Sequence, residues 1–264
     1  MSIDTNNDLT LSMLLRGLKL PSIAAQHEEV AGQAERGGWG FQQYLRHLIE
    51  LEHSQRKTRR IERLLKSSGL PAEKTLSALK LEKVPSKVRR QLPSLCEGGF
   101  VERAENVLAF GLPGRGKTHL VCAIGHELIQ RGYAVHFTSA VLLVQRLLVA
   151  KKALELEQEL KRLDAYDAVI LDDIGYIQQD REEMEVLFTF LAERYERRSV
   201  LITSNLVFSQ WDRIFKDPMT TAAAIDRVVH HSIILEMTGP THRATEANER
   251  AATDKKTAKS EDDA

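Results

Sequence analysis

One stretch of the sequence, residues 107–118, restricts the possible folds more than any other. It reads VLAFGLPGRGKT, an apolar run that ends in Gly-x-x-x-x-Gly-Lys-Thr. This spacing is typical of a phosphate-binding loop, in which a strand, a glycine-rich turn and the start of a helix follow one another. The glycines let backbone N–H groups close around phosphate oxygens, where a Cβ atom would obstruct them. We therefore predict a nucleoside triphosphate site.

Each residue of this loop is expected to have its own role in nucleotide binding. Lys117 is predicted to bring a point charge to the β- and γ-phosphates, and the Thr118 hydroxyl to bind Mg²⁺. The helix that begins at Lys117 adds its free amides and the positive end of its dipole. The predicted nucleotide-binding residues are Gly111, Leu112, Pro113, Gly114, Arg115, Gly116, Lys117, Thr118 and His119.

A second motif supplies two carboxylates. Residues 168–173 read AVILDD, an apolar run that closes on Asp172 and Asp173. Because the C-terminal ends of parallel strands share one edge of a sheet, Asp172 is expected to reach the metal held by Thr118. Asp173 is the candidate for polarising the attacking water. The predicted metal ligands are therefore Thr118 and Asp172.

Other polar residues lie beside predicted strands. Asn205 follows the apolar run 200–203 and is predicted to hold the lytic water or the γ-phosphate, the alternative being an amide that closes a turn. His230 and His231 precede a predicted strand. Since neighbouring side chains point to different sides of the chain, we expect these two histidines to be poor joint metal ligands.

Composition excludes some classes of protein. The chain has 264 residues, 42% of them hydrophobic, which is ample for a core, and no apolar run is long enough to span a membrane. It begins with a polar, acidic segment, so no signal peptide is expected. Two cysteines, Cys96 and Cys122, are too few for a zinc site or a disulfide framework. We expect buried thiols and a cytoplasmic protein.

The formal net charge is zero, but the basic residues are concentrated in one region. Residues 56–90 contain twelve Lys or Arg against three acids. Four arginines within this region recur at the spacing of one helix face, which is typical of a contact with a phosphate backbone, although a solvated helix face is the alternative. No base-reading motif is present, so any DNA contact should be independent of sequence. The candidate DNA contacts are Arg56, Arg59, Arg60, Arg63, Lys151 and Lys152.

The pattern of apolar residues, glycines and prolines divides the chain into four parts. We predict a helical domain for DNA or partner binding over 1–68, a linker punctuated by glycine and proline over 69–99, and an α/β ATPase domain over 100–238. The polar, charge-mixed end, 239–264, is predicted to be disordered.

Taken in order, the phosphate loop, the paired aspartates, Ser204-Asn205 and the sequence IDRVV resemble the AAA+ family of ATPases over about residues 100–235. The whole chain more specifically resembles the IstB-type ATP-binding proteins of bacterial insertion sequences, relatives of the DnaC-type helicase loaders. The N-terminal segment favours the IstB type, because helicase loaders vary most there. The segments that carry this resemblance are LLRGLKLPSIAAQHEEV (14–30), FVERAENVLAFGLPGRGKTHL (100–120) and AIDRVVHHS (224–232).

The resemblance implies ATP and Mg²⁺ as cofactors and a parallel sheet of five strands with helices on both faces, after a small all-α domain and without a C-terminal helical lid. It implies that Asn205 is a sensor and that Thr138 is a candidate switch, holding Asp173 away until DNA is bound. It also implies that Arg227 is an arginine finger that reaches the γ-phosphate in a neighbouring subunit. The alternative for Arg227 is a surface arginine paired with Asp226.

Two residues depart from the common pattern of the AAA+ family. Many members have Asp-Glu where this chain has Asp172-Asp173, and the shorter side chain implies slow hydrolysis, stimulated by DNA or a partner. Arg115 stands where a small or hydroxyl residue is common in the loop, and the sequence leaves open whether it faces solvent or DNA.

The leading hypothesis is an ATPase that assembles on duplex DNA as a homo-oligomer, with ATP sites between subunits, and assists a partner transposase in choosing its target. The alternative is a helicase loader that grips single strands. Single-strand binders interleave bases with aromatic side chains. Residues 56–90 contain no Phe, Tyr or Trp, which disfavours the loader. A small-molecule kinase is disfavoured because the sequence shows no acceptor pocket and such an enzyme would not need Arg227.

Overall fold

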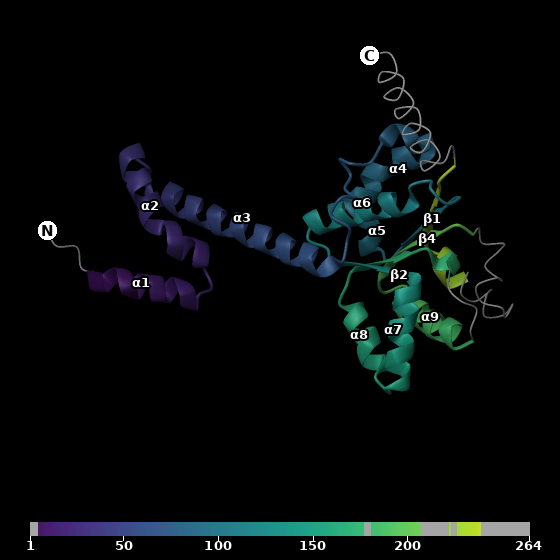
Figure 1. Cartoon of the computed structure of the whole chain (residues 1–264). Helices are drawn as coiled ribbons and strands as arrows, with labels where there is room; N and C mark the ends of the chain where they lie inside the picture. The colour runs from purple at the N-terminus through teal and green to yellow at the C-terminus, as the bar shows by residue number, and fades with distance from the viewer. Residues whose placement is uncertain (1–4, 177–180, 207–221, 223–225, 239–264) are drawn as a thin grey trace, which may run out of the picture. The chain divides into compact units, whose positions relative to one another are not determined.

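The computed structural model describes residues 5–176, 181–206, 222 and 226–238. The chain divides into two compact units, Met1–Arg63 and Leu64–Ala264, of which the second contains the sheet (Figure 1). The predicted disordered tail, 239–264, and the first two residues of the sequence AIDRVV (224–229) lie outside the described residues. No described helix is both long and apolar enough to cross a membrane.

Helices build the N-terminal unit. A turn after α1 leads to Pro21 at the first position of α2, where a missing N–H costs nothing, and α2 ends at Gly38 in the left-handed conformation. The core of the unit is small, with Ile23, Val30 and Leu48 buried together. The helices are α1 (Thr5–Gly17), α2 (Pro21–Gly37) and α3 (Phe41–Ser68), the last continuing into the second unit.

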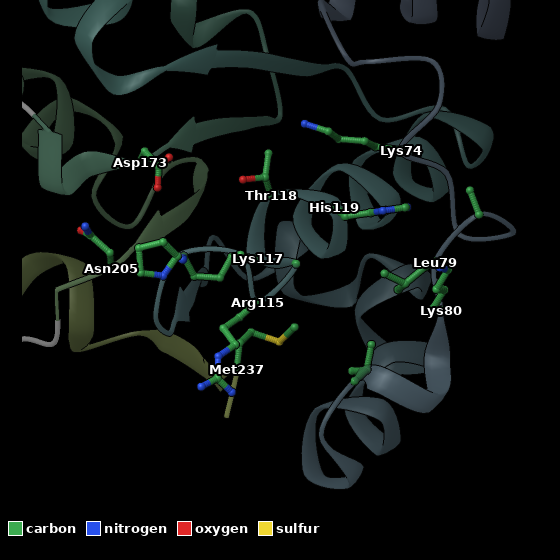
Figure 2. A pocket seen from close by; sticks show the side chains of 15 residues that line it. Lys74, Leu79, Lys80, Arg115, Lys117, Thr118, His119, Asp173, Asn205 and Met237 are labelled. Atoms are coloured by element: carbon green, nitrogen blue, oxygen red, sulfur yellow. The ribbon is translucent and has the colours of Figure 1, made fainter. Parts of the chain in front are cut away.

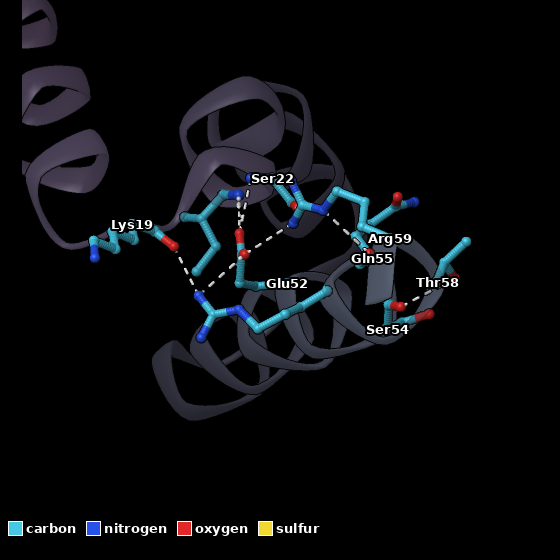
Figure 3. Close-up of polar contacts among 9 residues, drawn as sticks. Lys19, Ser22, Glu52, Ser54, Gln55, Thr58 and Arg59 are labelled. Atoms are coloured by element: carbon cyan, nitrogen blue, oxygen red, sulfur yellow. Dashed lines mark hydrogen bonds and ion pairs between the residues drawn. The ribbon is translucent and has the colours of Figure 1, made fainter. Parts of the chain in front are cut away.

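A buried carboxylate holds two helices of this unit together. Glu52 of α3 is 4% exposed and accepts hydrogen bonds from the backbone N–H groups of Ser22 (2.8 Å) and Ile23 (3.3 Å), at the start of α2 (Figure 3). Since Leu20 offers no side-chain cap, Glu52 supplies the missing acceptor and a negative charge at the helix N-terminus. Burial of the Glu52 carboxyl opposes its ionisation, but these N–H groups, with Arg59, outweigh burial and lower its pKa.

The second unit is built on a five-stranded sheet in the order β2-β3-β4-β1-β5, with all four pairs of neighbouring strands parallel, as predicted. Of the three inner strands, β1 and β4 are buried along their whole length and β3 along all but its last residue, as expected for strands covered on both faces. The elements of this unit are η1 (Leu81–Lys83), α4 (Ser86–Glu97), α5 (Gly99–Glu102), β1 (Asn106–Phe110), α6 (Lys117–Gln130), β2 (Val135–Ser139), α7 (Ala140–Lys152), α8 (Leu156–Asp164), β3 (Ala168–Asp172), η2 (Ile174–Tyr176), α9 (Arg181–Arg194), β4 (Ser199–Ser204) and β5 (Ser232–Glu236).

Helices cover both faces of this sheet (Figure 1). Alternate residues of the strands, such as Leu108, Val169 and Ile202, share one core cluster with α7, α8 and α9. On the other face α6 approaches closely, since a Cβ atom added to Gly125 would lie 2.8 Å from Ile170 Cδ1. The predicted buried thiols are confirmed: Cys96 and Cys122 are both buried and free, and burial raises the pKa of Cys122 to about 12.

The stretch 69–99, expected to be a linker, contains regular structure. Helix α4 lies within it and packs on α6 and α5, with Val88, Leu92 and Leu95 buried. Pro85 and Gly98 flank α4 at its two ends, where these residues are also favoured, whereas Pro93 lies inside this helix. The functional division of the chain into domains stays a prediction.

We predict that Glu52→Gln lowers the free energy of unfolding of the N-terminal unit by about 1–2 kcal/mol, because α2 loses a charged cap. In a Trp211→Phe background Trp39 is the sole tryptophan, so urea unfolding followed by its fluorescence reports on this unit. The pKa of Glu52 is lowered in the folded state, so its stabilisation is present above the ordinary value of 4.5 and is lost as the pH falls through its folded pKa.

The matched control is Glu50→Gln, which removes a carboxylate from the exposed ion pair with Arg46. This change should alter the unfolding free energy by less than about 0.5 kcal/mol. Equal effects of the two substitutions, or a Glu52→Gln effect that persists below the folded pKa, would contradict the assignment.

Candidate nucleotide-binding site

The phosphate-binding loop connects β1 to α6, as predicted. Gly116 precedes α6 with φ 81°, in the left-handed region that glycine adopts without strain. At the other end of the loop, a Cβ atom added to Gly111 would lie 2.5 Å from the Met237 carbonyl oxygen. No side chain of the described residues caps the first turn of α6, so its N-terminus is suited to an anion.

Lys117 lies at the centre of this loop and is 6% exposed. Its Nζ donates to the carbonyl oxygens of Gly111 (2.7 Å) and Leu112 (3.2 Å). It also lines a cavity of about 480 Å³, together with Thr118, Asp173 and Asn205 (Figure 2). The loop therefore holds the ammonium group beside the space that a triphosphate would fill.

A hydrogen-bonded cluster joins the loop to the ends of β3 and β4. Oδ1 of Asp172 accepts hydrogen bonds from the hydroxyls of Thr118 and Thr203, each at 2.7 Å. The Thr203 hydroxyl in turn accepts the backbone N–H of Asp173 at 2.8 Å, and Asp173 has a φ of 57°. Thr203 thus positions both aspartates. Thr203 was not predicted, because a threonine inside an apolar strand gives no sign of its hydrogen bonds.

The donors of this cluster fit a magnesium ion. Thr118 and Asp172 present a hydroxyl and a carboxylate, which are hard oxygen donors, and the two side chains already meet. Mg²⁺ is bound in such sites by one or two protein oxygens, with waters and phosphate oxygens completing its shell. The structure therefore brings together the two predicted metal ligands, whose role in binding Mg²⁺ stays a prediction.

Asn205 follows β4 and lines the same cavity. Its Oδ1 is buried and has no hydrogen-bond partner among the described residues, so it is not closing a turn through that oxygen. A Cβ atom added to Gly175 would lie 2.2 Å from this oxygen, which explains why a glycine follows the aspartate pair at that place. The amide is available to a water or to a phosphate.

One side of the cavity comes from the stretch that was expected to be a linker. Lys74, Leu79, Lys80 and Val84 line it from this stretch, and Met237, after β5, lines it beside Arg115 (Figure 2). None of these five residues was predicted. Their positions depend on how residues 69–84 pack, and no motif marks them.

Two histidines of α6 hold this segment in place. Nε2 of His119 lies 3.0 Å from the Thr75 carbonyl oxygen, and Nε2 of His126 lies 3.0 Å from that of Pro71. Seven residues apart, the histidines share one face of the helix. Their spacing is the signal that could have revealed the contact. His119 also lines the cavity, consistent with its predicted place in the nucleotide site.

Arg227 and Thr138 have different surroundings. Arg227 is in the helical segment 226–229, and its guanidinium carbon lies 4.7 Å from the centroid of the Phe188 ring of α9. Its Nη1 is buried without a hydrogen-bond partner, and no ion pair with Asp226 is found in the described part of the chain. Thr138 donates to the Ser139 carbonyl oxygen at 3.2 Å. The finger and switch roles stay predictions.

The candidate DNA contacts do not all have the same environment. Arg56 and Arg59 both pair with Glu52, at 3.4 and 3.2 Å, and so help to hold α2. Lys151 pairs with Glu185 of α9 at 2.9 Å. A helix-face pattern cannot separate arginines that serve the fold from those that face a ligand. Among the candidates, Arg63 and Lys152 are exposed, and Arg60 is exposed with a contact of its own.

His230 and His231 lie closer together than expected. Their ring centroids are 4.3 Å apart, and Glu196 joins them so that one ligand atom of each of the three lies within 4.8 Å of the others. A turn at His230, after the helical segment, and the positive φ of Glu196 bring them together. All three are exposed.

Fold and site together define the class of this protein: a parallel sheet in this order, a phosphate-binding loop after β1 and an aspartate pair after β3 make it an AAA+ P-loop protein. More particularly, the chain belongs to the family of IstB-like ATP binding proteins, whose family model matches residues 13–250.

Relatives match over most of the chain. It is 41% identical over 247 residues to an insertion sequence ATP-binding protein of Sinorhizobium fredii, covering 93% of this chain and 83% of the relative. It is 34% identical over 253 residues to the ATP-binding protein of insertion sequence IS21 from Pseudomonas aeruginosa, covering 96% of each. The predicted resemblance to IstB-type proteins is confirmed.

Solved structures share the fold at lower identity. The replication initiator DnaA, bound to AMPPCP and single-stranded DNA, superposes with a TM-score of 0.56 at 18% identity, over 70% of this chain and 56% of that one. DnaI superposes with a TM-score of 0.54 at 19% identity, over 65% of this chain and 96% of that one. These likenesses confirm the predicted AAA+ fold.

We predict that Thr203→Val, which removes the hydroxyl but keeps the shape of the side chain, raises the Mg²⁺ concentration needed for half-maximal ATP hydrolysis by about 10–100-fold. Nucleotide affinity measured without Mg²⁺ should stay unchanged, since Thr203 acts on the aspartates. Thr189→Val is the matched control, because that hydroxyl bonds only to the Glu185 carbonyl among the described residues. A loss of Mg²⁺-free affinity would instead indicate a disturbed fold.

Proposed function

We propose that this protein is an ATPase that binds ATP and Mg²⁺ at the loop after β1 and uses ATP to assemble on duplex DNA, where it assists a partner transposase. The observation that carries the proposal is the contact between Thr118 and Asp172 at 2.7 Å, beside the buried Lys117. The names of its relatives, ATP-binding proteins of insertion sequences, support the link to transposition.

In this proposal each residue of the site has one part in hydrolysis. Lys117 exchanges its two loop carbonyls for the β- and γ-phosphate oxygens, and Thr118 and Asp172 bind the metal. Mg²⁺, when bound, neutralises charge on the phosphates. Asp173 accepts a hydrogen bond from the attacking water, and Asn205 donates to the same water or to the γ-phosphate. The segment with Leu79 and Val84 encloses the base.

The site is completed by a neighbouring subunit. The guanidinium of Arg227 stacks on Phe188, and its buried Nη1 has no hydrogen-bond partner among the described residues. The side chain is therefore held in place with one donor available to a ligand. In the assembled state this nitrogen donates to the γ-phosphate bound by the adjacent subunit. The guanidinium then stabilises the negative charge that develops on the phosphate during hydrolysis. Assembly and hydrolysis are thereby coupled.

Exposed basic residues bring the assembly onto DNA. Among the described residues, Arg63 and Lys152 have no ion pair of the kind that engages Arg56, Arg59 and Lys151, and they contact phosphates without reading bases. The transposase then recognises the protein–DNA assembly, and hydrolysis releases it. The chain marks the target in this scheme and cuts nothing.

We predict that ATP increases the affinity of the protein for a short DNA duplex in filter binding, and that added salt weakens this binding steeply because counterions are released. Lys117→Ala should remove the effect of ATP. A preference for single strands, or DNA binding unaffected by ATP in the wild type, would contradict the proposal and favour a helicase loader or another class of protein.

We predict that Arg227→Ala lowers ATP hydrolysis by about 10³-fold or more and changes nucleotide affinity little, because a finger acts on the transition state of a neighbour. Mixing Arg227→Ala with Asp173→Asn should restore part of the activity. In mixed assemblies the intact nucleotide site of an Arg227→Ala subunit can lie beside the intact Arg227 of an Asp173→Asn subunit. Equal losses of affinity and hydrolysis, without rescue on mixing, would show that Arg227 supports its own subunit.

A further inference from the structure

Arg115 is the residue of the phosphate-binding loop whose role the proposed function leaves open. It lies between Gly114 and Gly116 and lines the nucleotide cavity with Met237. Its Nε and Nη1 atoms are buried and have no hydrogen-bond partner among the described residues. A cation with unsatisfied buried donors is costly to maintain, so an acceptor is expected to meet it in the working state.

The surroundings of Arg115 indicate which acceptor this is. In Figure 2 its side chain extends from the loop toward Met237, whereas Asp173 and Asn205 lie on the opposite side of Lys117. Those two residues mark the γ-phosphate end of the site. Arg115 therefore faces the part of the nucleotide that ATP and ADP have in common.

We infer that Arg115 binds the nucleotide of its own subunit, through the α-phosphate and the adjoining ribose, and holds ADP as firmly as ATP. This inference rests on the proposed function, since it needs a nucleotide in the cavity. Nζ of Lys117 already donates to the loop carbonyls of Gly111 and Leu112, so Arg115 brings a second positive charge to the cavity beside Met237. The protein then keeps its nucleotide after hydrolysis, and ADP release becomes a controlled step.

Isothermal titration calorimetry with ADP and with a non-hydrolysable ATP analogue tests this inference. Arg115→Thr, which restores a small hydroxyl residue to the loop, should weaken both ligands equally, by about tenfold or more, because a charge-assisted hydrogen bond is lost. Arg115→Lys keeps the charge and should lose less. Arg103→Thr removes an exposed arginine that pairs with Glu105 outside the cavity, and should bind both ligands like the wild type.

Thermal unfolding separates binding from folding. Without nucleotide, Arg115→Thr should unfold at or above the temperature of the wild type, because no hydrogen bond of Nε or Nη1 is lost. Added ADP should raise that temperature less in the variant than in the wild type. A clearly lower unfolding temperature without nucleotide would make Arg115 a structural residue and overturn the inference.

Other outcomes are equally decisive. Unchanged affinity for both ligands in Arg115→Thr would overturn the inference. If the same variant also bound duplex DNA more weakly, Arg115 would be a DNA contact instead. Loss of the ATP analogue alone would place Arg115 at the γ-phosphate and overturn it as well. Failure of the wild type to bind either ligand would overturn the proposed function. Loss of binding in Lys117→Ala, with normal binding in Arg115→Thr, would support the proposed function and overturn the inference about Arg115.

Discussion

The oxygen Oδ1 of Asp172 accepts hydrogen bonds from Thr118 and Thr203, and the rest of the site depends on this contact. It joins the first turn of α6, the end of β3 and the inner strand β4, three elements that are far apart in sequence. The parallel register makes the contact geometrically possible, because β3 and β4 pair from Ala168 with Ser199 onward and end at the same edge. A single hydroxyl, on Thr203, also holds the backbone of Asp173 in its left-handed conformation.

Buried polar groups perform a comparable task away from the site. Arg194 is 2% exposed, and its guanidinium donates to carbonyl oxygens that include those of Leu163, Tyr166 and Ser199, joining α9 to the segments before β3 and β4. In the N-terminal unit Glu52 does the same for α2 and α3. Several hydrogen bonds hold each of these charges, although Nε of Arg194 has no partner among the described residues, so removing a further partner would leave a buried charge poorly compensated. They fix the ends of the elements that carry functional residues.

Much of the fold and of the site could be predicted from local patterns. The apolar runs that begin at 107, 168 and 200 were each found as a strand within one residue of the expected ends, because short apolar runs between turn residues have few other solutions. Thr118 and Asp172 meet as the motifs indicated. Thr203, Leu79 and Met237 were not predicted, since their roles in the site depend on residues that are distant in sequence and close in the fold. The arginines of α3 were equally hard to interpret from sequence. Arg56 and Arg59 form ion pairs with Glu52, although the sequence pattern places all three residues on the surface of a helix.

The sequence by itself determined the class of chemistry, because the glycine spacing, the lysine and the paired aspartates are read along the chain and their geometry is local. It also determined the family, through segments that match relatives over most of the chain. Only the tertiary structure decided which hydroxyl positions the aspartates, which segment closes the cavity opposite the loop, and that two buried nitrogens of Arg115 have no partner among the described residues. The physical reason is that hydrogen bonds and burial depend on neighbours brought together by the register of the sheet and the packing of α6, neither of which is written in any single stretch of residues.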